Sequence, residues 1–114
     1  MLITITPNPV LDKTITVERI IYNEMSRATA IQEDWGGKGF NVSRALHAMG
    51  MQSLAMGFSG GATGHKLEQG LTEIGIYTEL VPISDETRTN IIITEADHNR
   101  YIKVNEAGPA LQPA

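Results

Sequence analysis

The sequence contains no cysteine, which excludes disulfide bridges, a thiol nucleophile and any Cys-ligated zinc site. Aromatic residues make up only 5% of the chain, and 9 Lys and Arg stand against 13 Asp and Glu, giving a formal net charge of −4. This acidic balance disfavours a nucleic-acid partner. The N-terminal apolar run is too short for a signal peptide or a membrane span, so we expect a cytoplasmic protein without a membrane partner.

The composition that remains, 41% hydrophobic and 19% charged, is typical of a globular protein. At 114 residues the chain is one ordinary domain or part of a larger one. Its three histidines lack metal-ligand spacing, so we expect no metal site within the chain.

Strand and helix signals alternate over the first two-thirds of the sequence. A β-branched run at 2–6 and a second at 14–17 predict strands, and a glycine-dense loop is expected at 34–39. The first predicted helix follows that loop and has an apolar stripe of Val42, Ala45, Leu46 and Met49. A buried strand at 53–58 then precedes a second helix with Thr63 as its N-cap and a stripe of Leu67, Leu71 and Ile74.

The last third changes to strands alone, at 77–83, 87–94 and 100–104, which we interpret as a β-meander. Consecutive strand–helix units predict an α/β fold with a parallel sheet, and the final strands require a second, smaller antiparallel sheet.

The segment Gly36-Gly37-Lys38-Gly39 directly before a helix is the most informative local feature. Glycines let the backbone approach a ligand, the helix N-terminus favours an anion, and Lys38 adds a positive charge. Asn41 can form hydrogen bonds from the first helical turn. A tight turn with a solvated lysine explains the local pattern equally well, and the segment matches neither the Walker A nor the dinucleotide-binding motif.

Three charged side chains are further candidates for binding. Asp12 follows the first strand, at the sheet edge where ligands bind in open α/β folds, and its carboxylate suits sugar hydroxyls, although a turn-forming role is the alternative. Arg27 and Arg88 suit phosphate, with an exposed surface charge as the alternative for each. Trp35 could stack on a ligand, but a role in the core is favoured.

The order of these segments resembles the ribokinase-like sugar kinases, and most closely the phosphofructokinase-B branch with 1-phosphofructokinase and tagatose-6-phosphate kinase. The motifs that carry the resemblance are Thr-Pro-Asn-Pro-Val-Leu-Asp (6–12), Gly-Gly-Lys-Gly-Phe-Asn-Val-Ser-Arg-Ala-Leu (36–46), Gly-Phe-Ser-Gly-Gly-Ala-Thr-Gly (57–64), Thr-Arg-Thr-Asn (87–90) and Asn-Glu-x-Gly-Pro (105–109). The resemblance implies the N-terminal part of an α/β/α sandwich with a small β-sheet lid. It implies a single partial domain over 1–114, with the main sheet and helices from about 1–12 and 36–83 and the lid strands from about 13–35 and 87–105.

The resemblance also implies an activity: transfer of the γ-phosphoryl group of ATP, with Mg²⁺, to a hydroxyl of a ketohexose phosphate. The site residues that it implies fall into three groups, namely Asp12, Gly36, Gly37 and Asn41 on the sugar, Lys38, Arg88 and less securely Arg27 on the phosphate, and Asn90 and Asn105 on the lid. A homodimer through the lid strands or an exposed sheet edge is a further expectation.

The sequence departs from the family in one respect. The family's catalytic base is an aspartate in a Gly-x-Gly-Asp motif near a late helix, and neither this motif nor the nucleotide-binding half occurs here. We therefore expect the N-terminal, sugar-phosphate-binding portion of a kinase, inactive by itself and without a catalytic residue of its own. The alternatives are a non-catalytic remnant or sugar-phosphate-binding module, and an unrelated regulatory α/β domain.

Overall fold

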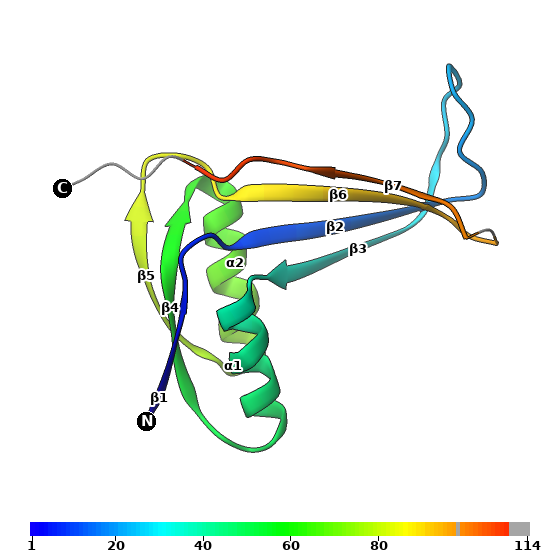
Figure 1. Cartoon of the computed structure of the whole chain (residues 1–114). Coiled ribbons are helices and arrows are strands. Elements are labelled where there is room, and N and C mark those ends of the chain that lie inside the picture. The colour runs from blue at the N-terminus through cyan, green and yellow to red at the C-terminus, as the bar shows by residue number, and fades with distance from the viewer. Residues whose placement is uncertain (98, 110–114) are drawn as a thin grey trace.

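The computed structural model describes residues 1–97 and 99–109, which form two β-sheets and two helices (Figure 1). The elements along the chain are β1 (Leu2–Thr6), β2 (Val10–Val17), β3 (Ala28–Gly36), α1 (Lys38–Ala48), β4 (Ser53–Gly60), α2 (Gly61–Glu73), β5 (Tyr77–Ile83), β6 (Arg88–Glu95) and β7 (Tyr101–Asn105).

Sheet A consists of β1, β4 and β5 in the order β1-β4-β5, and all of its strand pairs are parallel. Figure 1 shows both helices on the same side of this sheet. Parallel neighbours joined through helices confirm the predicted α/β class. In the described part of the chain, neither helix is long and apolar enough to cross a membrane.

Sheet B has the strand order β3-β2-β6-β7. Its outer pairs are antiparallel, but the central β2–β6 pair is parallel, so the small sheet is mixed where a purely antiparallel one was predicted. Of the last three strands, β5 follows α2 as a parallel crossover and pairs with β4 in sheet A, and β6 and β7 form a hairpin.

The chain crosses between the sheets at residues 7–9, at Gly37 and at residues 84–87. These crossings meet at one end of sheet B, where Gly36, Val10 and Arg88 are neighbours in the strand register. We call this end the root of sheet B. Figure 1 shows the sheet extending from its root away from sheet A.

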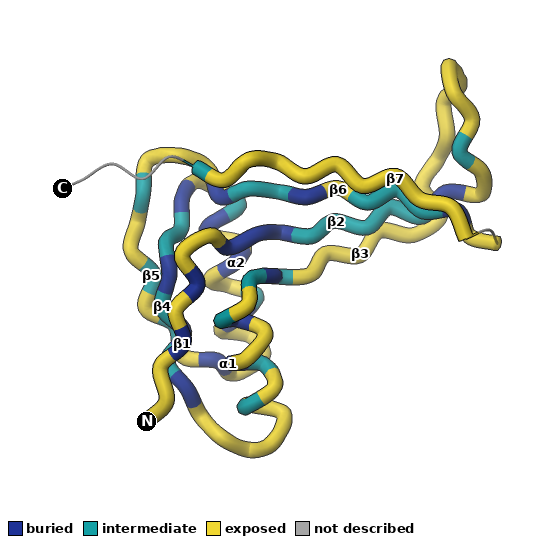
Figure 2. Tube along the Cα trace, viewed as in Figure 1, coloured by how far each residue is buried: buried dark blue, intermediate teal, exposed yellow. Residues whose placement is uncertain are grey.

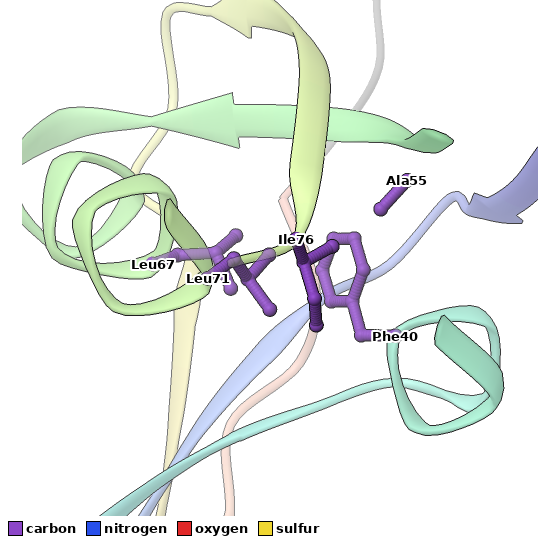
Figure 3. Packing of buried hydrophobic residues seen from close by; sticks show 5 residues of the cluster. All are labelled: Phe40, Ala55, Leu67, Leu71 and Ile76. Carbon is purple, nitrogen blue, oxygen red and sulfur yellow. The ribbon is translucent and has the colours of Figure 1, made fainter. Parts of the chain in front are cut away.

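The hydrophobic core lies between the helices and sheet A (Figure 3). It consists of Phe40, Ala55, Leu67, Leu71 and Ile76, with Trp35 and Leu80 packed against it. The predicted stripe of α2 is confirmed for Leu67 and Leu71, which are fully buried. It is wrong for Ile74, which caps the helix and is 44% exposed.

The predicted apolar stripe of α1 is wrong. Val42 and Met49 are 50% and 67% exposed, whereas Ser43 is completely buried. Ser43 can be buried because its hydroxyl is hydrogen-bonded to Thr4 of β1 (2.6 Å) and accepts a hydrogen bond from Ser53 of β4 (2.9 Å). Polar contacts therefore join α1 to both neighbouring strands.

Two predicted boundaries also differ from the structure. The loop expected at 34–39 is the end of β3 followed by the start of α1, and Gly37 alone lies between them with φ +126°. A side chain at Gly37 would collide with Thr6, so the turn requires glycine. The N-cap of α2 is Gly60 and not Thr63.

The face of sheet A opposite the helices is apolar and open. Ile3, Ile5 and Val81 lie on this face and are 57%, 68% and 50% exposed (Figure 2). A parallel sheet is normally covered on both faces, so this face is an unprotected apolar surface in the described chain.

Candidate functional site at the root of sheet B

The strand register of sheet B aligns several of the predicted site residues in one row. Asp12 on β2 lies between Asp34 on β3 and Asn90 on β6, and Asn90 lies beside Asn105 on β7. Residues that are direct cross-strand partners project from the same face of a sheet. Polar side chains from all four strands therefore share one face.

Arg88 belongs to the same face because it precedes Asn90 by two residues on β6. Its Nη2 donates a hydrogen bond to the Asn8 carbonyl oxygen at 3.3 Å, which ties it to the β1–β2 crossing. Its Nε is buried and has no hydrogen-bond partner among the described residues. A guanidinium with one free buried donor is suited to binding an anion such as phosphate.

Gly36 brings the backbone of β3 close to the Asp12 carboxylate. A Cβ atom at position 36 would lie 2.8 Å from Asp12 Oδ2 and 2.8 Å from Val10 Cγ1. A larger residue would therefore displace the carboxylate. Gly36 thus allows Asp12 to lie at the point where β3 turns into α1.

Lys38 and Asn41 lie in the first turn of α1, directly after this point. Both are exposed, and the first turn contains no acidic residue. The Asn41 amide donates to the Gly37 carbonyl at 3.0 Å, and its side-chain oxygen accepts a hydrogen bond from Arg44. The positive end of the helix and the Lys38 ammonium together favour an anionic ligand.

The pfkB family carbohydrate kinase profile matches residues 6–113 of the sequence. The chain belongs to the pfkB family of carbohydrate kinases. It is 35% identical over 98% of its length to a 1-phosphofructokinase of Xanthomonas campestris, and 30% identical over 98% to a tagatose-6-phosphate kinase of Staphylococcus epidermidis. The chain spans about a third of the length of these relatives, namely 35% and 36%.

Solved structures of the same family match the fold. Phosphofructokinase-2 from Escherichia coli in complex with fructose-6-phosphate superposes with a TM-score of 0.86 at 30% identity, covering 96% of this chain and 36% of that one. The ribokinase-like fold expected from the sequence motifs is thereby confirmed.

In this pfkB chain, the side chain of Asn90 already forms a hydrogen bond within the protein. It is 6% exposed, and its side-chain oxygen accepts a hydrogen bond from the Glu106 amide at 3.2 Å. The Glu106 carboxylate in turn accepts one from the Thr89 amide at 2.6 Å. These bonds leave the NH₂ group of Asn90 for a ligand, while Asn105 beside it is exposed.

Asp34 was not predicted as a site residue, although it is the direct partner of Asp12. Like charges on directly opposed strand positions are unfavourable, so this pair is not explained by sheet stability. No local pattern indicates this pairing, because it depends on the register between β2 and β3.

Arg27 lies apart from the other predicted residues. It precedes Ala28, which pairs with Val17 at the far end of β2. The five residues from Val17 back to Asp12 span about 17 Å of strand. Within one chain, Arg27 therefore does not join Arg88 and Lys38.

Trp35 serves the core, as the sequence interpretation favoured: its indole packs against the buried cluster. In the described part of the chain, no three His, Asp or Glu side chains gather where they could hold a metal ion. The cations and amide groups at the root of sheet B suit a polar anionic ligand.

Proposed function

We propose that this chain is the sugar-phosphate-binding part of an ATP-dependent hexose-phosphate kinase of the 1-phosphofructokinase or tagatose-6-phosphate kinase type. The observation that carries the proposal is the register of sheet B, which puts Arg88, Asp12, Asn90 and Asn105 on one face at the root. Membership of the pfkB family supports it.

The proposal divides the ligand between two sets of residues. Hydroxyls of the sugar are bound by Asp12, Gly36, Gly37 and Asn41, and reached from sheet B by Asn90 and Asn105. The phosphate is bound by Arg88 and Lys38: Gly36 and Arg88 flank Val10 in the strand register, and Lys38 begins α1 two residues after Gly36. Arg27 is left out of the phosphate site because of its separation along β2.

In the complete reaction, ATP with Mg²⁺ supplies the phosphoryl group and the charge that stabilises its transfer. The residues of this chain contribute to that reaction by holding and orienting the acceptor. We propose that the chain by itself transfers no phosphoryl group, because the sequence has no Gly-x-Gly-Asp motif. A cytoplasmic location belongs to the same proposal, since sugar phosphates are formed inside cells.

Calorimetric titration of the 114-residue protein with fructose 1-phosphate, fructose 6-phosphate, tagatose 6-phosphate and free fructose tests the proposal. We expect at least one sugar phosphate to bind more tightly than fructose, and Arg88→Ala to remove the difference. Lys13→Ala is the matched control, because Lys13 follows Asp12 on β2 and projects from the opposite face. Equal binding of sugar phosphates and fructose by the unaltered protein would refute the proposal.

We also propose that two copies associate through the face of sheet B opposite the site. One cross-strand row on that face consists of isoleucine on all four strands: Ile31, Ile15, Ile93 and Ile102. Ile31 is 58% exposed and Ile102 is 37% exposed. An exposed apolar band of this kind favours association, and one relative, E. coli phosphofructokinase-2, has a tetrameric inhibited form. Sedimentation of the Ile31→Lys variant is expected to show a monomer where the unaltered chain shows a dimer.

A further inference from the structure

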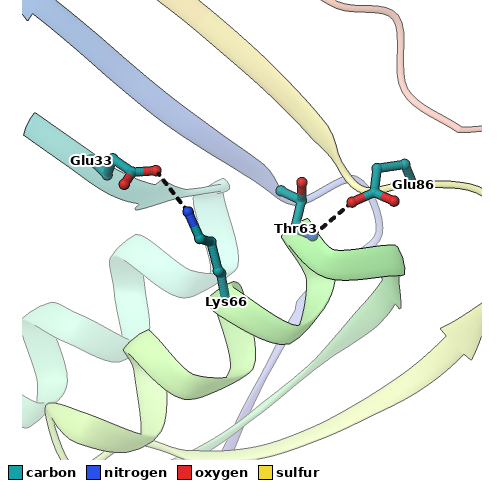
Figure 4. Close-up of polar contacts among 4 residues, drawn as sticks. All are labelled: Glu33, Thr63, Lys66 and Glu86. Atoms are coloured by element: carbon teal, nitrogen blue, oxygen red, sulfur yellow. Dashed lines mark hydrogen bonds and ion pairs between the residues drawn. The ribbon is translucent and has the colours of Figure 1, made fainter. Parts of the chain in front are cut away.

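The connection from β5 to β6 is fastened to the N-terminus of α2. The Thr87 amide donates to the Gly60 carbonyl at 3.0 Å, and the Gly60 amide donates to the Thr87 hydroxyl at 3.0 Å. The Thr63 amide donates to the Glu86 carboxylate at 2.7 Å, as Figure 4 shows. Three hydrogen bonds thus join two consecutive residues to the N-cap and the first turn of one helix.

Glu86 takes the place of a cap that α2 lacks. The N-cap residue is Gly60, it has no side-chain hydrogen bond to the helix, and the first turn contains no acidic residue. The free amides and the positive end of the helix therefore attract a carboxylate from another part of the chain. The hydrogen bond from Thr63 lowers the pKa of Glu86 below its usual value.

Gly61 makes room for this contact. It has φ +65°, and a Cβ atom at this position would overlap the Glu86 carboxylate. The connection continues into Thr87, which is 2% exposed. Glu86 and Thr87 are therefore held on a fixed path directly before β6 begins.

The residue that begins β6 is Arg88, whose guanidinium carries the unpaired buried Nε described above. We propose that Glu86 is a positioning residue: by binding the α2 N-terminus it fixes the start of β6, so that Arg88 is held ready for the phosphate of the substrate. This inference rests on the proposed function, because Arg88 is its phosphate ligand. Glu86 itself touches no ligand in this arrangement.

The test compares Glu86→Ala and Glu86→Gln with Asp85→Ala. Asp85 is the matched control, because it is an exposed acidic neighbour in the same connection whose side chain, among the described residues, forms no hydrogen bond to α2. The first measurement is the ¹⁵N NMR signal of Arg88 Nε without ligand. We expect Glu86→Ala to shift it, Glu86→Gln to shift it less because an acceptor oxygen remains, and Asp85→Ala to leave it unchanged.

The second measurement is the dissociation constant for the sugar phosphate that binds best and for fructose. We expect Glu86→Ala to weaken binding of the sugar phosphate about tenfold and binding of fructose by less than about threefold. A residue that only capped α2 would lower the melting temperature and leave the ratio of the two constants unchanged.

The outcomes separate the two proposals. If Glu86→Ala moves the Thr63 amide signal but neither the Arg88 Nε signal nor the ratio of constants, Glu86 is a cap and the inference is wrong. If the unaltered protein does not prefer a sugar phosphate, the proposed function fails, and the Arg88 Nε signal still decides whether Glu86 places that side chain. Should Glu86→Ala lose its cooperative unfolding transition, Glu86→Gln provides the same comparison.

Discussion

The indole ring of Trp35, at the end of β3, packs directly against Gly70 in the middle of α2. A Cβ atom at position 70 would overlap Nε1 and Cδ1 of the indole. Gly70 is unfavourable for helix formation, but at this position it allows the indole of β3, and with it sheet B, to pack closely against α2. The ion pair between Lys66 of α2 and Glu33 of β3 (3.7 Å) lies on the same contact between these elements (Figure 4).

Gly70→Ala is predicted to destabilise the fold although alanine favours helices. Helix propensity alone would add about 1 kcal/mol of stability, but the overlap with Trp35 is expected to lower the free energy of unfolding by about 1–3 kcal/mol in net effect. Urea unfolding measures the change. Gln69→Ala, on the exposed side of the same helix, is expected to change it by less than about 0.5 kcal/mol.

Introducing Gly70→Ala into a Trp35→Leu variant tests whether overlap with the indole is the cause of the destabilisation. If the indole is responsible, Gly70→Ala is neutral or stabilising once the ring is gone, and a double-mutant cycle shows a coupling between the two positions. Equal destabilisation in both backgrounds would show that Gly70 is required for a different reason.

Asp12→Asn is predicted to weaken binding of fructose and of a sugar phosphate by the same factor, about tenfold. The reason is that the carboxylate accepts hydrogen bonds from hydroxyls that both ligands share, whereas Arg88 contacts only the phosphate. Calorimetric titration of Asp12→Asn and of Arg88→Ala with fructose and with a sugar phosphate measures how far each variant weakens the binding of each ligand. A loss confined to the sugar phosphate would mean that Asp12 acts through the cations and not on the sugar.

The contact between Glu86 and α2 is predicted to make stability depend on pH under acidic conditions. Because the pKa of Glu86 is lowered in the fold, the contact contributes fully above the usual glutamate pKa and is lost as the pH falls through the lowered value. The other ionisable side chains close by in the sequence are Asp85 and Arg88 in the same connection, and His65 and Lys66 on α2.

Thermal melts of the unaltered protein and of Glu86→Gln between about pH 5.5 and about pH 3 measure this effect. The melting temperatures are expected to differ at the upper end of the range and to converge at the lower end. A constant difference across the range would show that the charge of Glu86 is not involved.

The open face of sheet A is predicted to cause association and low stability of the chain. Ile3 and Ile5 expose apolar surface on the edge strand β1, and Val81 exposes apolar surface on the other edge strand, β5. Ile5→Thr is expected to reduce light scattering at high protein concentration and to reduce binding of a fluorescent apolar dye. Val42→Thr, which changes an exposed valine on α1, is the control. A sharp monomeric melt of the unaltered chain would contradict this prediction.

The sequence was sufficient for the elements that local patterns determine. The β-branched runs predicted β1 and the second half of β2, and the spacing of Leu67 and Leu71 predicted the buried side of α2. The buried side of α1 could not be predicted in this way. Ser43 is buried because of partners 39 and 10 residues away, and a serine without knowledge of those partners is assigned to the surface.

For the candidate site, the sequence was sufficient to select several residues but not to predict that they lie together. Asp12, Arg88, Asn90 and Asn105 could be selected by residue type and by family motifs. Their presence on one face depends on the parallel pairing of β2 with β6, which are separated by 78 positions in the register from Val10 to Arg88. Local patterns do not contain such long-range pairing. Asp34 was missed for a similar reason, because its position opposite Asp12 depends on the register of β2 with β3.

Sheet B contacts the helices near its root, through Trp35 and Glu33 of β3, and extends from there away from sheet A. Strand β2 of this sheet has 8 residues and is therefore about 26 Å long. A rotation of about 10° at the root would carry the far end through about 4–5 Å while moving Arg88 and Asp12 very little. The angle between sheet B and sheet A thus depends on residues near the root, and residues near Val17 would undergo the largest displacement. Any rotation of sheet B at its root would therefore be largest near Val17, where a fluorescent label would report it with the greatest sensitivity.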